Sequence, residues 1–118
     1  MSDLVIVHHH PAGFLEGRPS PGSGRHGEII GSFLQSDVQG DLETARTLLA
    51  EIAAAERGEN PEPAGVGNAF SIAITPDGAV IRNAVVEGAS AERYSLPELR
   101  AALETWIAAI ESVPPDDR

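Results

Sequence analysis

The sequence predicts an α+β fold in which a small antiparallel sheet of about four strands packs against two amphipathic helices. Two segments repeat apolar residues at helical spacing, short β-branched runs lie around them, and a Pro-Asp-Gly turn joins two strand-like runs. The chain has 118 residues and no cysteine, a length typical of one domain. Residues 1–118 are therefore expected to form a single domain stabilised by packing rather than by disulfides.

The N-terminal part is expected to hold two strands separated by a flexible loop. Residues 4–8 contain the run Leu-Val-Ile-Val shortly before Pro11, which predicts a short strand that stops at the proline. Residues 12–27 are rich in glycine and proline and predict a flexible loop. Residues 28–33 return to apolar character, and we assign them to a second strand.

The first helix is predicted over residues 37–57, where apolar residues recur at steps of four and three. These residues are Val38, Leu42, Ala45, Leu49 and Ile52. Ser36 and Asp41 are both good N-cap residues, so the stable start of the helix lies at one or the other. Arg57 and Gly58 are typical of its C-terminal end.

A hairpin is predicted next, with strands over residues 69–75 and 79–86. Apolar and small residues alternate along the first strand, and the segment Thr75–Gly78 supplies Pro76 and Gly78 at turn positions that favour them. A second helix is predicted over residues 96–113, because Ser95 and Glu98 form a capping-box pattern before it.

The charge of the chain excludes several partners. Eighteen Asp and Glu against eight Arg give a net charge of −10, which disfavours direct binding of nucleic acids or anionic membrane surfaces and favours a cationic partner. Residues 36–68 hold seven acids and two arginines, which is half of the net charge. No signal peptide or membrane-spanning stretch is recognisable, so we expect a cytoplasmic protein.

The histidines give the most conspicuous polar cluster. In an extended strand His8 and His10 project to the same side, so with His26 or Glu28 they form a candidate three-ligand metal site. The alternative is that exposed histidines end an edge strand and only titrate near neutral pH. Neither a nucleophile motif nor a phosphate-binding loop is present, so we expect no enzyme activity and no cofactor.

Several segments together resemble the immunity proteins of bacterial contact-dependent growth inhibition systems, and the likeness covers about residues 27–113. The segments are Gly27–Gly31 before an acidic helix, Gly67–Ile72 leading through Pro76–Gly78 to Val80–Asn83, and Tyr94–Leu99 before a helix that contains Trp106. The resemblance implies a non-enzymatic protein that binds a cognate toxin domain, frequently a nuclease acting on tRNA, and neutralises it in a 1:1 complex.

The charge supplies a mechanism for such a protein, because an acidic surface can fill the cationic cleft of a ribonuclease in place of its substrate. The candidate contact residues rest on charge and expected exposure: Asp37, Asp41, Glu43, Glu51 and Glu59. Two alternatives stay open. One is a histidine-based metal-binding protein or small metalloenzyme, and the other is an acidic nucleic-acid mimic that regulates a nucleic-acid-binding protein.

Overall fold

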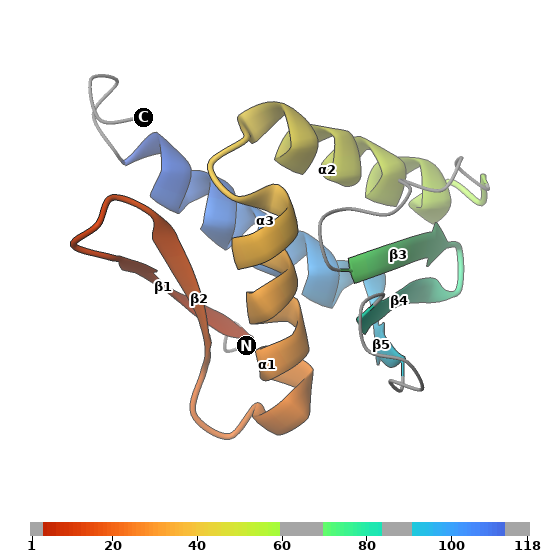
Figure 1. Ribbon diagram of the computed structural model, residues 1–118. Helices are drawn as coiled ribbons and strands as arrows, with labels where there is room; N and C mark the ends of the chain where they lie inside the picture. The colour runs from red at the N-terminus through yellow and green to blue at the C-terminus, as the bar shows by residue number, and fades with distance from the viewer. Residues whose placement is uncertain (1–3, 60–69, 84–90, 113–118) are drawn as a thin grey trace.

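The computed structural model describes residues 4–59, 70–83 and 91–112, and the described chain is an α+β fold (Figure 1). In order, its elements are β1 (Val5–His9), β2 (Leu15–Pro19), α1 (Gly24–Phe33), the π-helical turn η1 (Leu34–Val38), α2 (Leu42–Glu56), β3 (Phe70–Thr75), β4 (Gly78–Asn83), β5 (Glu92–Tyr94) and α3 (Leu96–Glu111). No helix in these ranges is long and apolar enough to cross a membrane.

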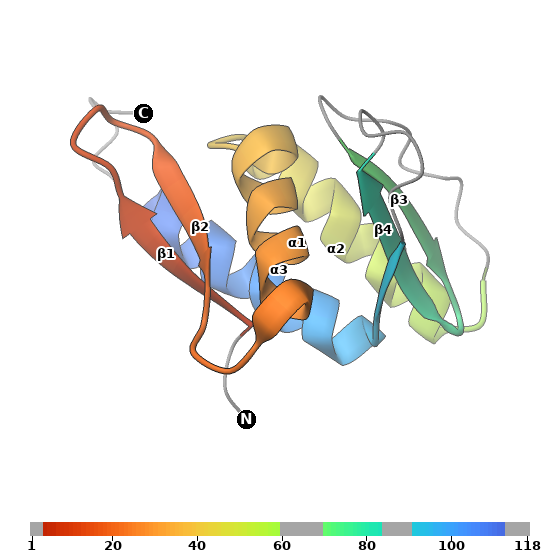
Figure 2. The ribbon, with the colours of Figure 1, turned by 60° about the horizontal axis from the view of Figure 1, so that its bottom comes forward.

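The strands form two antiparallel sheets rather than the one sheet predicted. β1 pairs with β2, and β3, β4 and β5 form a separate sheet in that order. Figure 2 shows the two sheets on opposite sides of the helices, with β1–β2 at one side and β3–β4–β5 at the other. The core lies between them, and its fully buried side chains come mainly from the helices: Ile30, Leu34, Ile52, Leu99, Leu103, Trp106 and Ile110.

The prediction of a strand over residues 28–33 was wrong, because these residues belong to helix α1. A short apolar run is compatible with the periodicity of a strand or of a helix. Here the buried residues follow a helical spacing: Gly27, Ile30, Gly31 and Phe33. Two of them are glycines, which let other backbone segments pack directly against this face of the helix.

The prediction of a flexible loop over residues 12–27 was also wrong, since this segment contains β2 and the first turn of α1. A tight turn joins β1 to β2, in which the Gly13 N–H donates to the His10 carbonyl at 2.8 Å. Gly17 does not interrupt β2. It lets the strand cross α1 so closely that a Cβ on Gly31 would lie 2.7 Å from the Gly17 carbonyl oxygen.

The predicted helix 37–57 begins later, at Leu42. Asp41 rather than Ser36 is its N-cap, and the chain before it makes a tight turn in which the Asp41 N–H donates to the Val38 carbonyl at 3.1 Å. Gln39 has a φ of 55° in this turn, a conformation that costs most L-residues free energy. The buried Trp106 indole N–H donates to the Gln39 carbonyl at 2.6 Å.

The predicted hairpin is confirmed over β3 and β4, whose register pairs Phe70 with Asn83 and Thr75 with Gly78. The predicted residues 69 and 84–86 lie outside the described part. β5, which pairs with β4, was not predicted, because three residues of which two are charged give no strand pattern.

The predicted final helix is confirmed as α3, whose N-terminus is a complete capping box. The Glu98 N–H donates to the Ser95 hydroxyl at 3.2 Å, and the Ser95 N–H donates to the Glu98 carboxylate at 2.9 Å. Residue 113 of the predicted range lies outside the described part. Near its two ends α3 is tied to α2 by ion pairs, Arg100 with Glu56 and Arg46 with Glu111.

Candidate functional site

The five predicted acidic contact residues all lie in the described part of the chain. Asp37 is half-buried and already bonded within the fold, since its carboxylate accepts from the Ser36 hydroxyl at 2.8 Å and from the Phe70 N–H at 3.0 Å. It therefore anchors the first residue of β3 to the turn before α2. Its carboxylate has this structural role whether or not it also faces a partner.

Asp41 is exposed, but it is the cap of α2. Its carboxylate accepts from the Thr44 hydroxyl at 2.7 Å and from the Glu43 N–H at 3.0 Å. The hydrogen bonds from Thr44, above all that from its hydroxyl, lower the pKa of Asp41 below its ordinary value. The residue thus carries its charge at neutral pH and uses it to stabilise the helix N-terminus.

The other three residues differ in their surroundings. Glu59 is exposed and accepts from the Arg57 guanidinium at 2.7 Å. Glu51 is half-buried, one of its carboxylate oxygens is buried without a hydrogen-bond partner, and burial raises its pKa. Glu43 is exposed, and its carboxylate has no partner among the residues described.

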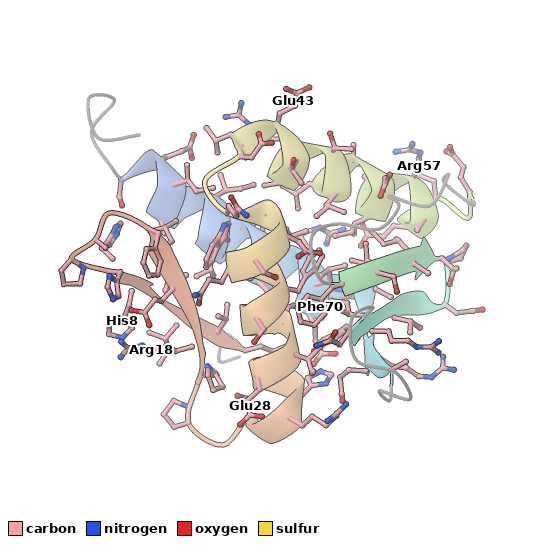
Figure 3. All side chains as sticks on the ribbon, in the orientation of Figure 1. His8, Arg18, Glu28, Glu43, Arg57 and Phe70 are labelled. Carbon is pink, nitrogen blue, oxygen red and sulfur yellow. The ribbon has the colours of Figure 1, made fainter. Side chains whose placement is uncertain are left out.

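Like Glu43, three further acidic side chains are exposed and have no partner in the described ranges: Glu28, Asp77 and Glu104. They lie on α1, on the β3–β4 turn and on α3. Figure 3 shows Glu43 and Glu28 at opposite ends of the molecule. Charge counting along the chain missed these three because only tertiary structure decides which carboxylates an arginine neutralises.

The histidines do not assemble into the metal site considered from the sequence. The described residues contain no group of three His, Asp or Glu side chains placed to hold a metal ion. His8 lies exposed on β1. The His10 ring stacks on Phe14 at 4.2 Å between centroids, and its Nδ1 accepts from the Ala12 N–H at 3.0 Å. These contacts organise the β1–β2 turn.

His26 instead lies in a cluster with residues from β5 and α3. Its Nδ1 lies 3.1 Å from a Glu92 carboxylate oxygen, and its Nε2 lies 3.0 Å from a Glu98 carboxylate oxygen. The imidazole stacks on Tyr94 at 4.1 Å, and the Tyr94 hydroxyl donates to the His26 carbonyl at 2.5 Å. Because ionised carboxylates only accept hydrogen bonds, this arrangement suits an imidazolium that donates from both nitrogens.

Protonation in this cluster follows from burial and hydrogen bonding. Burial, aided by the Glu92 charge, raises the pKa of the Tyr94 hydroxyl well above its ordinary value. For Glu98 burial acts in the same sense, but the hydrogen bonds from Ser95 and His26 outweigh it and lower the pKa. Through the contacts of His26 with Glu92 and Glu98 the cluster ties α1 to β5 and α3.

No family model, curated protein or solved structure matches the chain.

Proposed function

We propose that this protein is a non-enzymatic immunity protein that acts in the bacterial cytoplasm. It binds the cognate toxin domain of a contact-dependent growth inhibition system, a basic RNase or tRNase, in a 1:1 complex. It neutralises the toxin by occluding the cationic cleft in which the RNA would lie.

The observation that carries the proposal is the surplus of exposed carboxylates left without an internal partner. In a chain of net charge −10, Glu43, Glu104, Glu28 and Asp77 have no ion-pair or hydrogen-bond partner within the described residues. Glu43 and Glu28 lie at opposite ends of the molecule (Figure 3), so we expect a negative electrostatic potential at both ends. Such a potential speeds the encounter with a cationic partner.

A ribonuclease cleft suits this surface because it is built to hold a row of phosphates. Carboxylates of the inhibitor take the place of those phosphates, while the cytoplasmic RNA is kept out. Of the predicted contacts Asp37, Asp41, Glu43, Glu51 and Glu59, we expect Glu43 to contribute most, because its charge is neither buried nor paired within the fold.

The test requires the toxin domain encoded by the neighbouring reading frame. An equimolar amount of the immunity protein is expected to abolish cleavage of tRNA by that domain, and the association rate is expected to fall steeply as salt rises. Undiminished cleavage at a several-fold excess of the protein would refute the proposed function.

A matched pair of variants locates the contact surface. Glu43→Lys and Glu28→Lys change the net charge equally, but at opposite ends of the molecule (Figure 3). A contact on α2 predicts that Glu43→Lys slows association and speeds dissociation, whereas Glu28→Lys changes only the salt-dependent association rate. Equal effects of the two variants would remove α2 from the interface and leave the inhibitory function standing.

A further inference from the structure

The arginines of the described chain fall into two groups. Each of five has a carboxylate partner, in the pairs Arg18–Glu16, Arg25–Glu92, Arg46–Glu111, Arg57–Glu59 and Arg100–Glu56. Arg82 and Arg93 are exposed and have no ion-pair or hydrogen-bond partner among residues 4–59, 70–83 and 91–112. In a strongly acidic protein, these two guanidinium groups are the cations that the described fold leaves unneutralised.

Both unpaired arginines lie on the same face of one sheet. Arg82 is on β4 opposite Ser71, and Arg93 is on β5 opposite Val80. Because Val80 and Arg82 point to the same side of β4, the two arginines are diagonal neighbours. The Cα atoms of such neighbours lie about 7–8 Å apart. In Figure 2 helices α1, α2 and α3 all lie on the other side of this sheet.

The described side chains around the two guanidinium groups are mostly small. Ser71, Ala73 and Val80 share the outer face with them, and Ala73 is exposed. Beside Arg93 the face carries a hollow of about 100 Å³, lined by Ala73 and Val80 and, toward the β3–β4 turn, by Asp77. Among the described residues, an extended peptide that lies across this face meets only small or medium-sized side chains besides the two arginines.

We propose that this face binds an acidic, extended segment of a partner protein through Arg82 and Arg93. In an extended chain, alternate residues point to the same side and lie about 6.6–6.8 Å apart, which is close to the separation of the Arg82 and Arg93 Cα atoms, and the long arginine side chains can adjust to the difference. Carboxylates at alternate positions each meet one guanidinium, whose planar fork holds a carboxylate by two parallel hydrogen bonds. Since Asp77 lines the hollow beside Arg93, the acidic segment is expected to lie toward Arg82, away from the Asp77 carboxylate. This inference does not rest on the function proposed above.

The charges favour a protein segment over a nucleic acid as the occupant. A nucleic-acid strand brings a continuous row of phosphates, whose binding requires a comparable row of cations. The face offers two cations on a molecule of net charge −10, which repels a polyanion. A segment with two carboxylates and otherwise neutral residues needs only those two cations and meets less repulsion.

An NMR titration of the full chain tests the proposal. The probe is a capped pentapeptide with glutamates at its second and fourth positions, and the control peptide has glutamines there. The glutamate peptide is expected to shift the Nε–Hε signals of Arg82 and Arg93 together with the backbone amides of β4, and the glutamine peptide is expected to leave them in place.

Two double variants of equal charge change complete the test. Arg82→Gln with Arg93→Gln is expected to weaken binding of the glutamate peptide about tenfold. Arg46→Gln with Arg57→Gln, which removes two exposed but paired arginines, is expected to leave the affinity within about twofold.

Equal affinities in the two double variants would overturn the proposal. So would a pentanucleotide RNA that shifts the Arg82 and Arg93 signals at lower concentration than the glutamate peptide, because the face would then bind phosphate. If a variant fails to fold, the NMR titration of the unmodified chain with the two peptides still tests the proposal.

Discussion

The crossing of β2 over α1 depends on two glycines, and the substitution Gly31→Ala tests it directly. The added Cβ would lie 2.7 Å from the Gly17 carbonyl oxygen, 3.0 Å from the carbonyl carbon and 3.5 Å from a methyl group of Val5. The two nearest of these atoms belong to the backbone, so no flexible side chain can move aside. Either the hairpin β1–β2 or the helix must shift.

The size of the effect follows from two opposing contributions. Overpacking a well-packed site costs about 1–3 kcal/mol, and a clash with backbone belongs at the upper end of that range. Alanine is a better helix former than glycine by about 1 kcal/mol, which offsets part of the cost. We expect Gly31→Ala to lower the free energy of unfolding by about 2 kcal/mol, or the melting temperature by about 8 °C for a chain of this length.

The assay is thermal and urea unfolding followed by far-UV circular dichroism. Gly40→Ala is the matched control, because nothing lies within 4 Å of a Cβ built on Gly40 and the φ of Gly40 is not in the left-handed region. That variant is expected to be as stable as the unmodified protein or slightly more so. A Gly31→Ala variant as stable as the control would refute the close crossing of strand and helix.

Three further substitutions have expected outcomes. Glu51→Gln is expected to raise the urea midpoint at pH 7 but not at pH 3.5, because burial raises the pKa of Glu51 and so makes its ionised form unfavourable in the fold; the exposed Glu43→Gln should show no such gain. The pKa of Glu98 is lowered in the fold from an ordinary value of 4.5, so its contribution to stability is present above that pH and is lost as the pH falls through the folded value. Urea unfolding from pH 7 to pH 2.5 is expected to show a smaller acid loss for Glu98→Gln, and equal slopes would contradict this assignment. Gln39→Gly is expected to be more stable than Gln39→Ala by about 1 kcal/mol in thermal unfolding, since glycine relieves the strain at a φ of 55° and both variants lose the hydrogen bond from the Gln39 amide to the Ser36 carbonyl. Equal stabilities of the two variants would mean that the turn is unstrained.

The parts of the fold that were predicted correctly are those specified by local chemistry. Ser95 and Glu98 lie three residues apart and cap α3 by themselves, and the turn before Gly78 closes the hairpin of β3 and β4. The helical period of α2 was correct at Ala45 and Ile52, but Leu48 rather than Leu49 is buried. The start of this helix required a choice between Ser36 and Asp41. Each of these signals lies within a few residues.

The parts that were missed depend on distant partners. Whether residues 28–33 form a strand or a helix is decided by the backbone of β2, which packs against the glycine face of α1. Among the candidate contact residues, Asp37 is bonded to Phe70, which lies 33 positions along the chain. His26 meets Glu92 and Glu98 at separations of 66 and 72 positions. No pattern in one sequence reports such pairings.

The buried Trp106 gives the protein an intrinsic fluorescent probe of its core. The chain has one tryptophan, its side chain is fully buried, and its indole N–H is bonded to the Gln39 carbonyl. Its fluorescence therefore reports on the helical core and on the turn before α2. A partner that binds the outer face of the β3–β4–β5 sheet or the exposed carboxylates will leave the emission unchanged unless it moves the helices, so fluorescence separates surface docking from rearrangement of the core without an added label.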